Sequence, residues 1–103
     1  MGKIVYDRLV TVEFPDFELA HLQAVIGAKL RRGESFFFSW AQTGEQAPGS
    51  RSIWLHASAS LLFEYDDGGP RRLNRPWIEA LSASANTTAG LRPVPEPRSP
   101  VAG

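Results

Sequence analysis

Residues 21–40 constrain the fold more than any other part of the chain, because they combine a helix, a helix stop and an aromatic strand without a break. The helix is indicated by apolar residues at three- and four-residue spacing, namely Leu19, Leu22, Val25, Ile26 and Leu30. Gly33 supplies the left-handed residue that commonly ends a helix. The pattern predicts a helix over residues 16–32, with Asp16 as its N-cap.

Gly27 is unusual inside this predicted helix. A glycine in a helix interior costs about 1 kcal/mol relative to alanine. We therefore expect that another part of the protein packs very close to the backbone at Gly27.

The strand that follows the glycine stop has one strongly apolar face. Side chains alternate along it, with Phe36, Phe38 and Trp40 on one side and Ser35, Phe37 and Ser39 on the other. The alternation therefore places Phe37 opposite the other aromatic residues of this strand.

Four further strands are indicated by short β-branched and aromatic runs. They are residues 3–6 and 10–14, which form an opening hairpin, and residues 52–56 and 61–65. Glycine, proline and serine predict a surface loop over residues 41–50, and two aspartates, two glycines and a proline predict a turn over residues 66–70.

A second helix and a proline-rich tail complete the chain. Asn74 is suited to cap this helix, Pro76 fits its first turn, and the helix is expected to end between Asn86 and Gly90. Its apolar stripe consists of Trp77, Ile78, Leu81 and Ala85. Residues 92–103 contain four prolines, which predicts an extended or disordered tail after a single domain over residues 1–91.

These elements predict an α+β domain with the order β-β-α-β-β-β-α. Its core would be a mostly antiparallel sheet of about five strands, with two helices packed on it. If both helices cover the same face, the opposite face exposes Phe37, Trp54 and His56. Large apolar surfaces most often mark protein contacts. We therefore expect a non-enzymatic interaction module, either a homodimer or an adaptor for another protein.

Composition excludes several other functions. Eleven basic residues balance eleven acidic ones in 103 residues, so the net charge attracts neither nucleic acid nor anionic membranes. The chain has no cysteine, which excludes disulfides and thiolate chemistry. It also shows no apolar run long enough for a signal peptide or a membrane span, and we expect a cytoplasmic protein without membrane contacts.

A local basic patch is the alternative candidate site. It comprises cationic residues at the end of the first helix and before the second, namely Lys29, Arg31, Arg32, Arg71, Arg72 and Arg75. If the two groups lie close together, they would bind phosphates beside exposed aromatic residues. Arginines in a last helical turn also favour the helix dipole, and nearby acidic residues neutralise them. Nucleic-acid binding is therefore the less favoured hypothesis.

Catalytic, metal and cofactor sites find little support. The two histidines, His21 and His56, lack the close spacing of metal ligands, and such histidines are usually surface or half-buried residues. No nucleophile elbow, phosphate-binding loop or paired-carboxylate pattern is present. We predict no catalytic residue, metal or cofactor. A small enzyme would be recognised by a cleft that holds His21 or His56 beside a carboxylate.

Three segments, HLQAVIGAKLRRGESFFFSW, SIWLH and LNRPWIEALSASANTTAGLRPVPEP, resemble a family of short proteins of unknown function from high-GC Gram-positive bacteria. Members of this family often carry the label ATP-dependent DNA ligase. The sequence does not support that label, because ligases use a lysine in a KxDG motif and neither Lys3 nor Lys29 lies in one. The resemblance implies a cytoplasmic fold unit and supplies no functional residues.

Overall fold

A computed structural model describes residues 1–42, 49–68 and 72–97 of the chain. The strands are β1 (Gly2–Tyr6), β2 (Val10–Phe14), β3 (Phe36–Gln42), β4 (Gly49–Leu55) and β5 (Leu61–Glu64), and the helices are α1 (Asp16–Arg31) and α2 (Arg75–Ala85). This order is β-β-α-β-β-β-α, which confirms the predicted α+β class.

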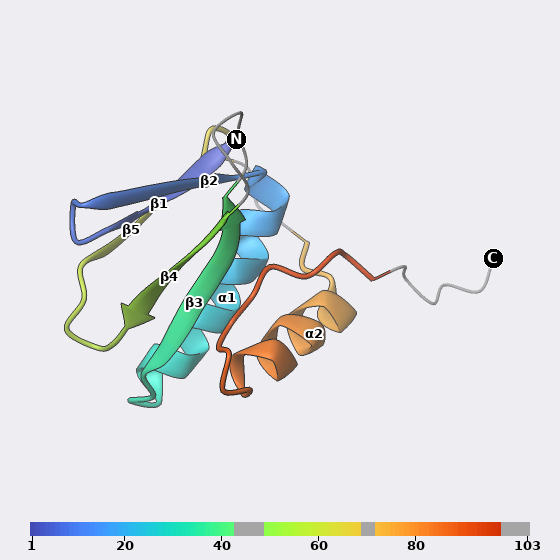
Figure 1. Cartoon of the computed structure of the whole chain (residues 1–103). Coiled ribbons are helices and arrows are strands. Elements are labelled where there is room, and N and C mark those ends of the chain that lie inside the picture. Colours follow the sequence, from blue (N-terminus) through green and yellow to red (C-terminus); the bar gives the residue numbers. More distant parts are fainter. Residues whose placement is uncertain (43–48, 69–71, 98–103) are drawn as a thin grey trace.

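The strands form two antiparallel sheets, where the sequence suggested one. The first has the order β2-β1-β5, and the second consists of β3 and β4 (Figure 1). In the first sheet Ile4 of β1 pairs with Val12 on one side and with Phe63 on the other. The sheets meet in the core, where the ring centroids of Phe14 and Phe38 are 6.0 Å apart.

The β3–β4 hairpin is longer than predicted. Both strands extend into the stretch 41–50, which the sequence assigned to a loop, and Ala41 pairs with Ser50. The middle of that loop, residues 43–48, and part of the turn predicted over 66–70 lie outside the described residues. Residues with little β-propensity therefore join a strand here because the adjoining ladder continues through them.

Helix α1 buries the predicted apolar face, and Leu19, Leu22, Val25 and Ile26 are all buried. Its stop is also confirmed. Gly33 has a φ of 76°, its N–H donates to the carbonyl of Leu30, and the N–H of Glu34 donates to the carbonyl of Lys29. These two bonds satisfy carbonyls that the last helical turn leaves free.

The predicted N-cap of α1 is wrong. Pro15 occupies that position, and Asp16 is the first helical residue. The Asp16 carboxylate instead accepts the backbone N–H groups of Asp66 and Asp67, at 3.1 and 3.0 Å. Its side chain therefore ties the helix to the segment after β5, a long-range contact that local sequence does not reveal.

Gly27 has open space around it, which contradicts the expected close packing. No atom lies within 4 Å of the position that a Cβ would occupy. We therefore expect Gly27→Ala to raise the free energy of unfolding by about 0.5–1 kcal/mol, since alanine restricts the unfolded chain and favours a helix. Urea denaturation checks this, with Ala24→Gly in the same helix as the reverse change. A loss of stability in Gly27→Ala would contradict the open site.

Helix α2 lies parallel to α1 and beside it (Figure 1). At the start of the pair, the backbone N–H of Asn74 donates to His21 Nε2 at 2.8 Å. At the end of the pair, Lys29 Nζ donates to Asn86 Oδ1, also at 2.8 Å. Asn74 precedes α2 as predicted, although its side chain makes no capping bond and donates to Glu96.

The segment after α2 returns along the free edge of β3. Leu91 is fully buried and forms a parallel bridge with Phe38. Its N–H donates to the carbonyl of Phe37, and its carbonyl accepts the N–H of Ser39. Farther along, the Trp77 indole donates to the carbonyl of Val94 at 2.8 Å. Residues 91–97 are thus extended and bonded to β3 and α2.

Candidate protein interaction surface

Phe37 and Trp54 lie opposite each other in the β3–β4 ladder. The carbonyl of Phe37 points toward Leu91, so Phe37 and Trp54 form a non-hydrogen-bonded pair, the type in which side chains approach most closely. Their ring centroids are 4.9 Å apart with edge-to-face geometry. Each side chain is nevertheless 46% exposed. This aromatic pair therefore packs together and stays open to solvent.

The aromatic pair belongs to a face of the β3–β4 hairpin that we call the outer face. Its side chains are Phe37, Ser39, Ala41, Ser50, Ser52 and Trp54. Ser39 and Ser52 join their hydroxyls by a hydrogen bond of 2.7 Å. His56 continues the alternation of β4, is half-buried, and accepts the N–H of Ser58 at Nδ1. The three residues predicted for partner binding thus follow one another on one side of the hairpin.

The opposite side of β3 faces the core. Phe36, Phe38 and Trp40 are all buried there. Lys29 of α1 lies over the Phe36 ring at 5.6 Å, and Figure 1 shows α1 behind β3. Because the helices cover the inner side, they leave the outer face uncovered.

Arg92 borders the outer face and was not among the residues that the sequence singled out. It follows the inward-facing Leu91, and its backbone N–H is fixed by Ser84 Oγ at 3.1 Å. A hollow of about 290 Å³ lies beside it, lined by Ser39, Trp40, Ala41, Ser50, Ser52, Arg92 and Pro93. Alternation from Leu91 gave a signal for this arrangement, but the proline-rich composition concealed it.

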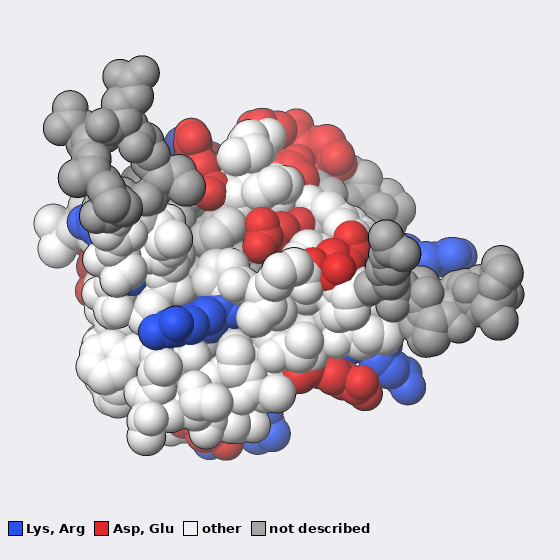
Figure 2. All heavy atoms as spheres, turned by 45° about the vertical axis from the view of Figure 1, so that its right-hand side comes forward, with Lys and Arg blue, Asp and Glu red and all other residues white. Residues whose placement is uncertain are grey.

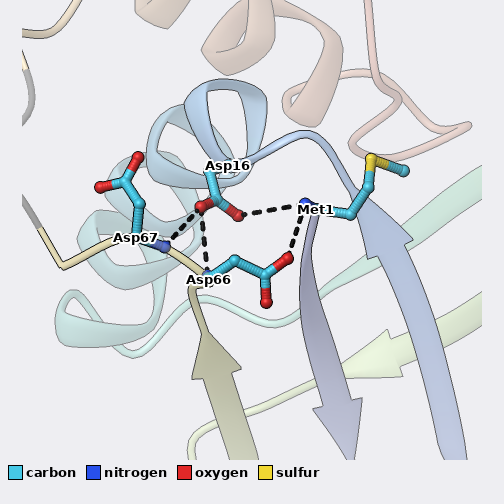
Figure 3. A network of polar contacts seen from close by, with 4 residues as sticks. All are labelled: Met1, Asp16, Asp66 and Asp67. Carbon is cyan, nitrogen blue, oxygen red and sulfur yellow. Dashed lines mark hydrogen bonds and ion pairs between the residues drawn. The ribbon is translucent and has the colours of Figure 1, made fainter.

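Charge is unevenly distributed over the molecule. Figure 2 shows that uncharged atoms dominate the lower left of that view, whereas acidic side chains gather toward its top. One acidic group surrounds the chain's first residue, whose amine lies 2.7 Å from Asp66 Oδ2 and 4.0 Å from Asp16 Oδ1 (Figure 3). The hydrogen bond with Asp66 raises the pKa of the Met1 amine. Within the described ranges, no group of three histidine or acidic side chains is arranged to hold a metal ion.

The predicted basic residues do not form one patch. Lys29 is buried and its amine bonds to Glu34 Oε1 at 2.8 Å as well as to Asn86. Arg31 donates to the Gly27 carbonyl, and Arg32 lies 3.9 Å from Glu34.

The remaining cations of that set lie at the other end of the helix pair. Arg72 and Arg75 are exposed near the start of α2, while Lys29 contacts its end. An 11-residue helix is about 16 Å long, so the two groups are separated by that length. Arg71 lies outside the described residues.

Glu34 gives a testable acid sensitivity. The hydrogen bond from Lys29 is the main cause that lowers the pKa of its carboxyl. A lowered folded-state pKa contributes stability above the unfolded-state pKa and loses it as the pH falls through the folded-state value. We therefore expect Glu34→Gln to be less stable than wild type at pH 7 and to lose less stability between about pH 5 and pH 3. Urea denaturation at both pH values measures this, and parallel profiles would contradict it.

His21 is fully buried, which contradicts the expected surface or half-buried position. Its Nε2 accepts the Asn74 N–H, so its Nδ1 carries the proton and donates to the carbonyl of Phe17 at 2.7 Å. The ring also lies 4.5 Å from the Trp77 ring. His21 therefore holds the two helices together. The ring bonds to backbone groups, and in the described part of the chain no carboxylate bonds to it.

The fold and this surface define a small α+β domain with an uncovered aromatic sheet face. The chain belongs to the family described as Domain of unknown function (DUF7882), whose model matches residues 1–96. No curated protein and no solved structure matches the chain. Over the described residues, neither helix has the length and apolar character needed to cross a membrane.

Proposed function

We propose that this chain is a non-enzymatic protein–protein interaction module that binds its partner through the outer face. The aromatic pair carries the proposal, because both rings are 46% exposed while their neighbours on β3 are buried. Aromatic residues are enriched at the centres of protein interfaces, where they supply large contact areas. His56 lies beside Trp54 on the same side of β4 and would contribute to the edge of the contact.

The outer face is also held in place before any partner binds. Tyr6 donates its hydroxyl to the carbonyl of Trp54 at 2.7 Å, which joins the hairpin to the first sheet. Leu91 fixes the other side of β3 through two backbone bonds. A surface ordered in advance loses less conformational entropy on binding than a flexible one. The proposal therefore involves no folding step.

Selection of binders from a displayed peptide library tests the proposal for a partner of any sequence. Peptides that bind wild type are expected to lose at least about tenfold in affinity to Trp54→Ala and Phe37→Ala, as removal of a central aromatic residue typically causes. Leu9→Ala is the matched control, since Leu9 is 84% exposed at the β1–β2 turn. If every selected peptide binds both aromatic variants as well as wild type, the outer face is not the contact surface.

Light scattering then separates the two kinds of partner. A homodimer predicts a mass above 11.3 kDa that rises with concentration and falls in Trp54→Ala. An adaptor for another protein predicts the monomer mass at all concentrations. The two results distinguish a second copy of this chain from a different partner.

Other functions have less support. The nucleic-acid alternative needs one basic patch, and the described cations are divided between the two ends of α2. The resemblance to short proteins of high-GC Gram-positive bacteria supports a bacterial cytoplasmic setting. It supports no ligase chemistry, because Lys29 is bonded to Glu34 and Asn86 and neither it nor Lys3 lies in a KxDG motif.

A further inference from the structure

Arg92 places a positive charge beside the aromatic pair. Leu91 points into the core in register with Phe38, so Arg92 aligns with Ser39 and points to the outer face. Among the residues that the structure describes, no carboxylate lies within ion-pair distance of Arg92. The outer face itself contains no acidic residue. Its cation therefore lacks a counterion from the same surface.

Hydroxyl groups complete an anion-binding arrangement around the hollow. In the Ser39–Ser52 pair, one hydroxyl donates to the other, so the second keeps a proton that it can donate to a ligand. Ser50 lines the same 290 Å³ hollow as Arg92. A guanidinium beside hydroxyl donors matches the geometry of a carboxylate.

The spacing of the two features indicates the shape of the ligand. Phe37 and Ser39 are two residues apart on β3, which corresponds to about 6.6 Å along a strand. In an extended peptide, side chains two positions apart point the same way at that same distance. An apolar residue over the aromatic pair would thus have an acidic residue of the same segment facing Arg92.

We propose that the partner presents an extended segment with an apolar residue and an acidic residue two positions apart. This inference rests on the proposed function and specifies the chemistry of the partner. Charge complementarity argues against a second copy packed face to face, because two copies of the outer face would bring two cations and no carboxylate together. Light scattering of wild type is accordingly expected to give the monomer mass of 11.3 kDa.

Two capped tripeptides test the proposal directly, acetyl-Phe-Ser-Glu-amide and acetyl-Phe-Ser-Gln-amide, which differ in one charge. Titration followed by amide chemical shifts should show that wild type binds the first peptide roughly three- to tenfold more tightly, the range of a partly exposed charge-assisted hydrogen bond. Arg92→Gln should bind both peptides equally. Arg75→Gln is the matched control, since Arg75 is exposed on α2 and its replacement changes the net charge identically.

Each outcome decides the matter. Equal affinities of the two peptides for wild type, or equal losses in Arg92→Gln and Arg75→Gln, would overturn the acidic partner. Absence of binding by both peptides would overturn it as well. Amide spectra confirm that the variants are folded. If library peptides depend on Trp54 but not on Arg92, this inference fails and the proposed function stands, whereas independence from Trp54 removes the proposed function itself.

Discussion

Gly90→Ala is expected to lower the free energy of unfolding by about 3 kcal/mol or more, a large part of the stability of a domain of this size. Two physical causes add together. Gly90 has a φ of 85°, which alanine adopts only with strain. In addition, the new methyl group would lie 2.8 Å from the Phe37 Cβ and closer still to the Phe37 carbonyl oxygen. The backbone must therefore move, and the bonds between Leu91 and β3 would be lost. Urea denaturation followed by tryptophan fluorescence measures the effect.

Gly33→Ala separates the two causes. Gly33 has a similar φ of 76°, but no atom lies within 4 Å of its added Cβ. Its replacement is expected to cost only the conformational strain, about 1 kcal/mol. Equal losses in the two variants would show that contact with Phe37 contributes nothing, and the packing of the 91–97 segment would then be much looser than described.

His21→Phe is expected to destabilise the protein by about 2–4 kcal/mol, because it removes both ring nitrogens from a fully buried site. The aromatic contact with Trp77 is retained in this variant, so the loss reports mainly on two backbone groups left without partners. These are the N–H of Asn74 and the carbonyl of Phe17. Denaturant unfolding gives the difference in free energy.

His56→Phe provides the comparison for this histidine. His56 is half-buried on the hairpin and receives one N–H bond at 3.3 Å. Its replacement is expected to change the free energy of unfolding by less than about 1 kcal/mol. A neutral effect of His21→Phe, or a larger effect at His56, would contradict the role of His21 as the link between the helices.

Local sequence patterns predicted the elements of this fold well. The apolar spacing from Leu19 to Ile26 predicted α1, and Gly33 predicted its end. Alternation on β3 correctly separated Phe38 in the core from Phe37 on the surface. These predictions succeed because each depends on neighbours in sequence, which the period of a helix or strand fixes.

Long-range contacts account for what the sequence did not reveal. The pairing of β1 with β5 joins residues far apart in the chain, and this pairing divides the strands into two sheets. Lys29 reads as a surface residue of a last helical turn, yet Asn86 and Glu34 draw it into a buried site. Arg92 became a candidate only when the bridge between Leu91 and Phe38 set its direction. Patterns of composition contain none of these contacts.

The return of Leu91 to β3 has a consequence for how the protein forms during synthesis. The β1–β2 and β3–β4 hairpins can assemble early, whereas β5 and Leu91 close contacts that span more than 50 residues. Completion of the core must wait until almost the whole polypeptide has left the ribosome. A chain that ends at Asn86 is therefore expected to be cleaved by proteases under conditions in which the complete chain resists them, as limited proteolysis can show.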